Sequence, residues 1–185
     1  VEQLEMLYPM LVEEMEIAPD SMGVGEWIGG PGAKIRIVPI AGDMSVFMFG
    51  DGCNNPPHGV LGGTPAIGGG MFIEHVAEGR RSFLSPTSDA VVKEGDVLVG
   101  VSSGGGGYGS PLDRPLERVL ADVRDGVISR GLAEKHFGLV FADDATLVLD
   151  EEATGARRTE LGQGDPPLID PVVPNTATWL REMMQ

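Results

Sequence analysis

The chain has 185 residues, a length that favours one domain with a sizeable core. Its formal net charge of −15 disfavours nucleic acid and anionic membrane surfaces as partners. A single cysteine excludes an internal disulfide framework, and no apolar run approaches the length of a membrane span, so we expect a cytoplasmic protein.

The first hundred residues carry short apolar patterns typical of strands, separated by turns rich in glycine and proline. Residues 2–7 predict a short helix that Pro9 ends, because proline lacks the helical N–H donor. The turn residues Gly42 and Asp43 separate two such patterns, so residues 34–49 predict a β-hairpin. The expected strands are residues 10–17, 34–39, 44–49, 71–76, 81–84, 89–93 and 97–101.

After the strands the pattern becomes helical. Apolar residues recur at i, i+3, i+4 and i+7 from Leu116 onward, which indicates one apolar helix face. Asp113 is the expected N-cap of this helix and Gly126 its expected C′ residue. The sequence therefore predicts an α+β fold, with a glycine-rich, mostly antiparallel β core followed by two or three helices and an extended arm.

Two further helices are expected. Ser129 caps the first, which Gly138 ends, and Asp150 caps the second, over residues 151–161. Residues 139–149 between them predict a hairpin-like pair. We expect one domain over residues 1–162, followed by a proline-rich arm, residues 163–185, whose apolar end docks on another subunit.

Four consecutive glycines, residues 104–107, stand between the last predicted strand and the first long helix. This order is also that of phosphate-binding loops, but the chain lacks the Gly-Lys-Ser/Thr of a P-loop, and Asp113 would repel a phosphate. The preferred interpretation is a backbone that passes very close to a ligand, a partner or another part of the chain. The candidate cleft or interface residues here are Gly105, Gly106, Gly107, Tyr108 and Arg114.

A second candidate group is Asp51, Cys53, Asn54 and His58, which fall within eight residues. A metal site and a thiol nucleophile are both conceivable, but no second ligand pair follows at regular spacing. The simpler interpretation makes Cys53 a small buried hydrophobe and lets His58 bond a loop carbonyl. We keep the four as cleft or interface candidates, and we assign no catalytic residue and no metal ligand.

Several segments resemble the C-terminal part of the B-type subunit in the hydantoinase B/oxoprolinase family. They are residues 19–21, 29–32, 56–59, 62–63, 104–114, 122–129 and 137–140. The resemblance implies a hetero-oligomer in which ATP is bound by a hydantoinase A-like subunit that phosphorylates an activated substrate oxygen. A chain carrying the N-terminal half of the B-type subunit would hold the divalent metal.

Because the family's metal ligands belong to that N-terminal half, the resemblance implies no cofactor bound by this chain alone and no activity in isolation. Trp27-Ile28 and Gly50-Asp51-Gly52 look more like the branch of acetone and acetophenone carboxylases. The resemblance therefore favours carboxylation of a ketone with bicarbonate. The alternatives are an ATP-dependent cyclic amidohydrolase, of the oxoprolinase, N-methylhydantoinase or lactamase type, and a non-catalytic scaffold.

Overall fold

The computed structural model describes residues 1–163 of the chain. Antiparallel strands come first and helices follow, so the predicted α+β fold is confirmed. The elements are α1 (Glu2–Leu7), β1 (Met10–Ala18), β2 (Gly32–Pro39), β3 (Met44–Phe49), the 3₁₀ helix η1 (Asp51–Cys53), β4 (Gly70–His75), β5 (Arg80–Phe83), β6 (Thr87–Val92), β7 (Val97–Val101), the 3₁₀ helix η2 (Pro111–Asp113), α2 (Leu116–Arg124), α3 (Arg130–Phe137) and α4 (Glu151–Gln163).

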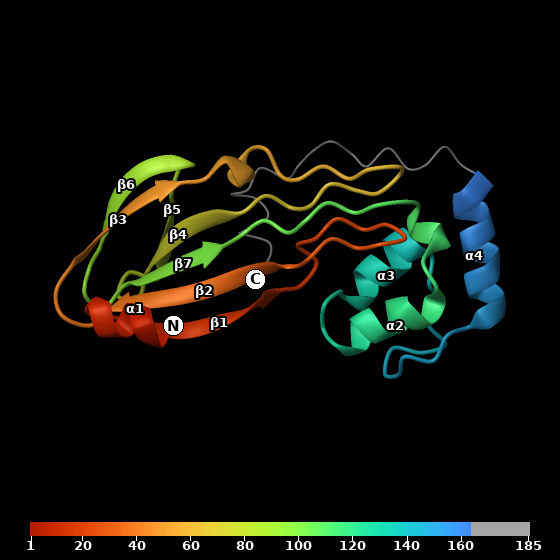
Figure 1. The fold of residues 1–185 in the computed structure, drawn as a ribbon. Helices are drawn as coiled ribbons and strands as arrows, with labels where there is room; N and C mark the ends of the chain where they lie inside the picture. The colour runs from red at the N-terminus through yellow and green to blue at the C-terminus, as the bar shows by residue number, and fades with distance from the viewer. Residues whose placement is uncertain (164–185) are drawn as a thin grey trace.

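The strands form two sheets that lie against each other (Figure 1). The larger has five strands in the order β1-β2-β7-β4-β5, and the smaller pairs β3 with β6. One face of the larger sheet presents Ile37, Ile73 and Leu98 to the inner side chains of the smaller sheet, among them Val46 and Val92. The two sheets therefore share an apolar core on this face.

The predicted hairpin of residues 34–49 is wrong. β2 pairs with β1 and β7, whereas β3 pairs with β6, so residues 40–43 connect two different sheets. The charged side chains of β2 explain its place, because Lys34 reaches Glu14 at 2.8 Å and Arg36 reaches Glu74 at 2.8 Å, on β1 and β4. These ion pairs lie on the face of the larger sheet that points away from the smaller one.

The helix boundaries follow the sequence signals with one exception. The Ser129 hydroxyl accepts from the third residue of α3 at 3.1 Å, and Gly138 ends the helix with φ +69°. The Asp150 carboxylate accepts an N–H of α4, which runs two residues beyond the predicted end. Asp113 is not the N-cap of α2, because it lies in η2 and the helix begins after Pro115.

Three long segments extend from the sheets toward the helices at the opposite end of the molecule (Figure 1), and only the third continues into them along the chain. They are residues 21–30, 57–66 and 104–109, which we call the glycine bundle. The helical end has its own core, with Val119, Ile128 and Phe137 at 1% exposure or less. Within residues 1–163, no helix is long and apolar enough to cross a membrane. Beyond Gln163, the predicted arm lies outside the described residues.

Candidate functional site

Each segment of the glycine bundle is hydrogen-bonded through its main chain to both of the others. Residues 104–109 lie at the centre: Gly105 donates to the Gly30 carbonyl at 2.8 Å, and Gly107 donates to the Thr64 carbonyl at 2.9 Å. The two outer segments are also joined, because Thr64 donates to the Val24 carbonyl at 2.8 Å. A β-sheet places neighbours on only two sides of a strand, so this three-way contact is a different arrangement.

The packing of this bundle explains the four consecutive glycines. A Cβ added at Gly106 would lie 2.0 Å from the carbonyl oxygen of His58, and one at Gly107 would lie 2.1 Å from that of Val24. None of residues 104–107 has a left-handed φ, so close approach rather than an unusual turn requires glycine here. The predicted close passage is confirmed, and the neighbours are two other segments of the same chain.

The same hydrogen bonds bear on the phosphate-loop alternative. A phosphate cradle needs several main-chain N–H groups directed at the ligand. In this loop the N–H groups of Gly105, Gly107, Tyr108 and Gly109 all donate to carbonyl groups of the neighbouring segments. These four donors are already occupied, so the loop does not fit nucleotide binding.

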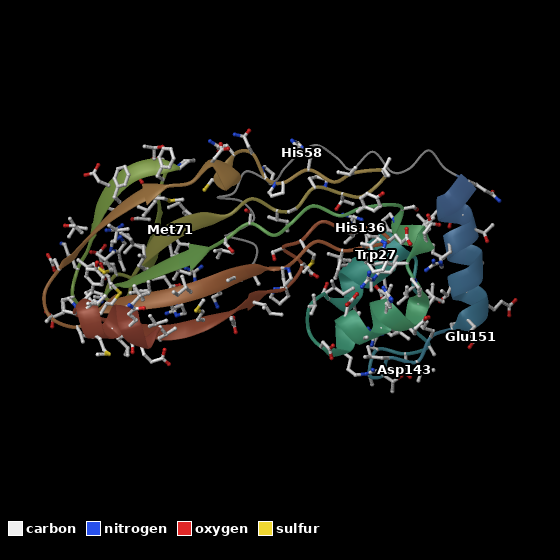
Figure 2. The ribbon with its side chains drawn as sticks, viewed as in Figure 1. Trp27, His58, Met71, His136, Asp143 and Glu151 are labelled. Atoms are coloured by element: carbon white, nitrogen blue, oxygen red, sulfur yellow. The ribbon has the colours of Figure 1, made fainter. Side chains whose placement is uncertain are left out.

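At the helical end of the bundle, two aromatic side chains lie at the surface. Trp27 and Tyr108 exchange main-chain hydrogen bonds, and about half of each side chain is exposed (Figure 2 labels Trp27). Arg118 of α2 stacks over the Trp27 ring at 4.9 Å. Trp27 lies at the surface, whereas its neighbour Ile28 packs against the helical core.

Arg114 is a structural residue in this arrangement. Its side chain is buried, it pairs with Asp122 at 2.7 Å, and it donates to the Glu26 carbonyl at 2.8 Å. A buried guanidinium needs a carboxylate and further acceptors to offset its desolvation. Arg114 therefore joins the segment carrying Trp27 to helix α2, and it is not presented to a ligand.

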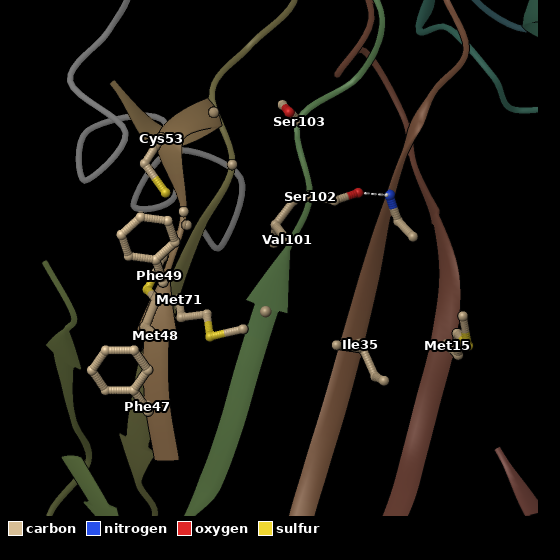
Figure 3. Close-up of a pocket in the computed structure, with 16 residues that line it drawn as sticks. Met15, Ile35, Phe47, Met48, Phe49, Cys53, Met71, Val101, Ser102 and Ser103 are labelled. Atoms are coloured by element: carbon tan, nitrogen blue, oxygen red, sulfur yellow. Dashed lines mark hydrogen bonds between the residues drawn. The ribbon is translucent and has the colours of Figure 1, made fainter. Parts of the chain in front are cut away.

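At the sheet end, an apolar cavity of about 450 Å³ opens between the two sheets (Figure 3). We call it the trough. None of the described residues that line it carries a charge, and Ser102 and Ser103 are its hydroxyl-bearing members. Its lining includes Met15, Ile35, Phe47, Met48, Phe49, Cys53, Met71 and Val101. The trough can hold an apolar group, and the Cys53 thiol is the one ionisable group among its described lining residues.

Cys53 is the one residue of its predicted group that reaches the trough. Burial, and secondarily the Asp51 carboxylate, raise the pKa of the Cys53 thiol, so the neutral thiol dominates at neutral pH. Asp51, Asn54 and His58 are exposed, and Asp51 accepts a hydrogen bond from Asn55 at 2.7 Å. Among residues 1–163, no three His, Cys, Asp or Glu side chains gather as a metal would require.

Sequence reasoning missed a hydrogen-bonded chain at the far end of the larger sheet. His75 bonds Asp96 at 2.8 Å through Nδ1 and Ser82 at 2.9 Å through Nε2. The connectivity is that of a hydrolase triad, but Arg80 also donates to the Ser82 hydroxyl at 2.7 Å. The three side chains come from β4, β5 and the turn before β7, so only the strand pairing could have predicted their meeting. We interpret the cluster as a cross-link between these strands.

Comparison with known proteins gives a consistent result. The family model described as Hydantoinase B/oxoprolinase matches residues 1–111. The caprolactamase beta subunit of Pseudomonas jessenii is 36% identical over 163 residues, which cover 85% of this chain and 27% of that protein. The acetone carboxylase alpha subunit of Xanthobacter autotrophicus is 27% identical over 192 residues, covering 85% of this chain and 25% of that protein. The chain thus spans about a quarter of the length of these relatives.

Two solved structures share the fold. The ATP-dependent caprolactamase from Pseudomonas jessenii aligns with a TM-score of 0.69 at 31% identity, covering 86% of this chain and 28% of the matched chain. Nucleotide-free acetone carboxylase aligns with a TM-score of 0.71 at 22% identity, covering 98% of this chain and 28% of the matched chain. The arrangement of sheets, bundle and helices is therefore found within much longer chains.

Proposed function

The chain belongs to the hydantoinase B/oxoprolinase family, and we propose that it forms part of the B-type subunit of an ATP-dependent, multi-subunit enzyme acting on a small carbonyl compound. The observation that carries the proposal is the 36% identity to the caprolactamase beta subunit across 85% of this chain. That relative is by name one subunit of an assembly. The proposal therefore includes other polypeptides, namely a hydantoinase A-like subunit and the remainder of the B-type subunit.

The chain's own chemistry supports an auxiliary role in that assembly. ATP-dependent activation of a carbonyl oxygen needs cationic groups and a metal near the transferred phosphoryl group. The described residues of the trough are uncharged, and the bundle's central N–H groups are bonded internally. We therefore assign the binding of ATP and of the divalent metal to the other parts of the enzyme. This chain would contribute an apolar wall.

Hydrolysis of a cyclic amide is the first candidate reaction. Its support is the higher identity to the caprolactamase protein, together with 31% identity over 159 residues to the putative B-type subunit of a D-/L-hydantoinase from a Pseudomonas species. A lactam ring is apolar on all sides but one, and an uncharged wall suits such a substrate. The trough would then contribute contacts to the ring and none to the reacting amide.

Carboxylation of a ketone is the second candidate. Trp27-Ile28 and Gly50-Asp51-Gly52 favour it, because these segments resemble the ketone-carboxylase branch more than the hydantoinases. The 27% identity to the acetone carboxylase alpha subunit is compatible with this alternative. The two reactions differ in their need for bicarbonate.

The test begins with the tagged chain, purified from its native host together with whatever subunits accompany it. ATP hydrolysis is then measured with caprolactam or hydantoin, and with acetone in the presence and absence of bicarbonate. Lactam- or hydantoin-dependent turnover without bicarbonate supports the first candidate, and ketone turnover that requires bicarbonate supports the second. The proposal is overturned if no other polypeptide co-purifies with the tagged chain. If the complex keeps its full activity after this chain is deleted, the chain is a non-catalytic scaffold.

A further inference from the structure

The two sheets of the sandwich are unequal, and the smaller one leaves part of the larger one uncovered. β3 and β6 cover Ile37, Ile73 and Leu98, which lie on β2, β4 and β7. On the neighbouring edge strand β1, Met15 points to the same side as its partner Ile35 and is 63% exposed. Ile17, two residues on, is 45% exposed. The uncovered region is therefore an apolar face beside β3, and not the charged face on the other side of the sheet.

Two cavities follow β3 from one end to the other. The trough, of about 450 Å³, is bordered by Phe47, Met48 and Phe49, and no residue of β6 lines it (Figure 3). A second cavity of about 460 Å³ is bordered by Met44 and Ser45, with Leu4, Tyr8 and Met10 of the N-terminal segment opposite. Both cavities thus lie along the side of β3 that faces β1 and α1, and together we call them the groove.

The main chain of β3 is directed into this groove at every second residue. Gly50, just beyond β3, donates to the Pro86 carbonyl at 2.9 Å and so continues the ladder with β6. Main-chain groups alternate in direction along a strand, so the even-numbered residues face β6 and Ser45, Phe47 and Phe49 face the groove. Within residues 1–163, the main chain of these three makes no hydrogen bond on that side. β3 is therefore an open sheet edge beside an apolar channel.

We propose that a β-strand from the part of the B-type subunit that this chain lacks pairs with the open edge of β3 and covers the groove. The inference rests on the proposed function, since that function supplies the missing polypeptide. The chain accounts for 27% of the length of the caprolactamase relative, so most of such a subunit lies outside it. Main-chain bonds to a sheet edge with alternate side chains in a groove are an established mode of peptide binding.

The geometry also determines what the added strand must look like. β3 has six residues, so a partner of about the same length, or roughly 20 Å, fits the edge. Every second side chain would face Met15 and Ile35, and those positions should be apolar. The opposite side chains would continue the outer surface that carries Phe47 and Phe49, which are 72% and 79% exposed.

A second copy of this chain does not fit the same edge. The inner side chains of its β3 already pack on its own larger sheet. Placing that strand beside the first β3 would bring its larger sheet into the space that β1 and β2 occupy. A β3–β3 pair between two copies is therefore sterically unfavourable, and the occupant is a different strand.

The experiment compares two proline variants of the tagged full-length chain in its native host. Phe47→Pro removes an N–H that faces the groove and places the proline ring there. The control is Asp89→Pro, at the residue of β6 that pairs with Phe47, because it removes an N–H at the other edge of the smaller sheet. We expect at least a tenfold loss of the co-purifying B-type polypeptide with Phe47→Pro and less than a twofold loss with Asp89→Pro. Phe47→Ala, which keeps the N–H, should retain the partner.

Two further measurements make the result independent of folding defects. In the wild-type complex, the amides of Ser45, Phe47 and Phe49 should exchange with deuterium at least tenfold more slowly than in the isolated chain. Met15→Lys should weaken the complex, while Val76→Lys, at an exposed position of the β4–β5 turn, should not.

Several outcomes overturn the inference while the proposed function stands. One is a complex that survives Phe47→Pro unchanged, and another is equal exchange at the three amides with and without partners. Protection that disappears when residues 164–185 are removed would assign the groove to this chain's own end, and a Phe47-dependent homodimer would assign it to a second copy. A wild-type chain that retrieves no other polypeptide contradicts the proposed function itself, and the inference falls with it.

Discussion

Gly106→Ala tests the packing of the glycine bundle with the smallest possible side chain. The added Cβ would lie 2.0 Å from the His58 carbonyl oxygen and 2.6 Å from its carbonyl carbon. Because real contacts of this kind stay beyond 3.0 Å, the two segments must separate by about 1 Å. Main-chain atoms, unlike the end of a flexible side chain, cannot turn away from the new methyl group.

The expected loss of stability follows from the bonds beside this contact. Gly107 donates to Thr64 and accepts from Val60, both at 2.9 Å, and a separation of 1 Å breaks both. Each is worth about 1 kcal/mol net, and overpacking adds about 1–3 kcal/mol. Gly106→Ala should therefore lower the free energy of unfolding by about 3–5 kcal/mol, a large part of the 5–15 kcal/mol typical of a domain.

Urea unfolding followed by circular dichroism measures this difference, and Gly30→Ala is the matched control. Gly30 lies in the same bundle, but a Cβ there meets nothing within 4 Å. The control should be neutral or stabilise the chain by about 0.4–1 kcal/mol, because alanine restricts the unfolded state. A Gly106→Ala variant within 0.5 kcal/mol of wild type, or one equal to the control, would refute the argument from close packing.

Three other predictions concern single side chains. Arg114→Met removes a buried guanidinium and leaves the partly buried Asp122 carboxylate without its partner, which should cost about 3–5 kcal/mol of stability. Arg124→Met at the exposed end of α2 should stay within about 0.5 kcal/mol of wild type. Because Cys53 is buried and burial raises the pKa of its thiol, native Cys53 should react more slowly with a thiol reagent at pH 7.5 than in urea, and equal rates would contradict this. Main-chain N–H and hydroxyl donors lower the pKa of Asp143 from its usual 3.8. The stabilising contribution of Asp143 is therefore present above pH 3.8 and is lost as the pH falls through the lower folded-state pKa. NMR titration of the carboxyl carbon measures that folded-state pKa.

Local signals predicted the helices well because the residues that end a helix act within one turn of it. The capping roles of Ser129, Gly138 and Asp150 could be predicted without knowledge of the tertiary structure. The N-cap of α2 was missed because Asp113 is drawn into η2, whose cap is the Ser110 hydroxyl. The elements themselves were thus predictable, and the error arose where two short helices compete for the same residues.

Strand pairing could not be predicted in the same way, since it depends on residues far apart in the chain. The turn at Gly42 is real, with φ +83°, but it connects two sheets and not two paired strands. The charges argue against a hairpin, because Lys34 and Arg36 need carboxylates and β3 has none to offer. Their partners Glu14 and Glu74 lie 20 and 38 residues away.

For the candidate site too, local features could be predicted from the sequence and contacts between distant segments could not. The run at residues 104–107 indicated close approach, but glycine carries no pattern that names the neighbour. Asp51, Cys53 and His58 are near in sequence, yet only Cys53 lines the trough, because the side chains of the other two are exposed. The cluster of His75, Ser82 and Asp96 had no local signature at all.

The glycine bundle has a consequence for how the chain can work within a larger enzyme. The sheet end carries the trough and the open edge of β3, and the helical end carries Trp27 with Arg118 above it. Main-chain hydrogen bonds at close approach hold the segments between these ends together, with the Thr64 hydroxyl, which accepts from the Val24 N–H at 2.8 Å, as a side-chain addition. The close contacts at the glycines involve no side chain and cannot be repacked by rotamer changes, so the two surfaces keep a fixed separation. A substitution such as Gly106→Ala should therefore disturb the geometry of both ends together, whereas Phe47→Pro should affect only the sheet end.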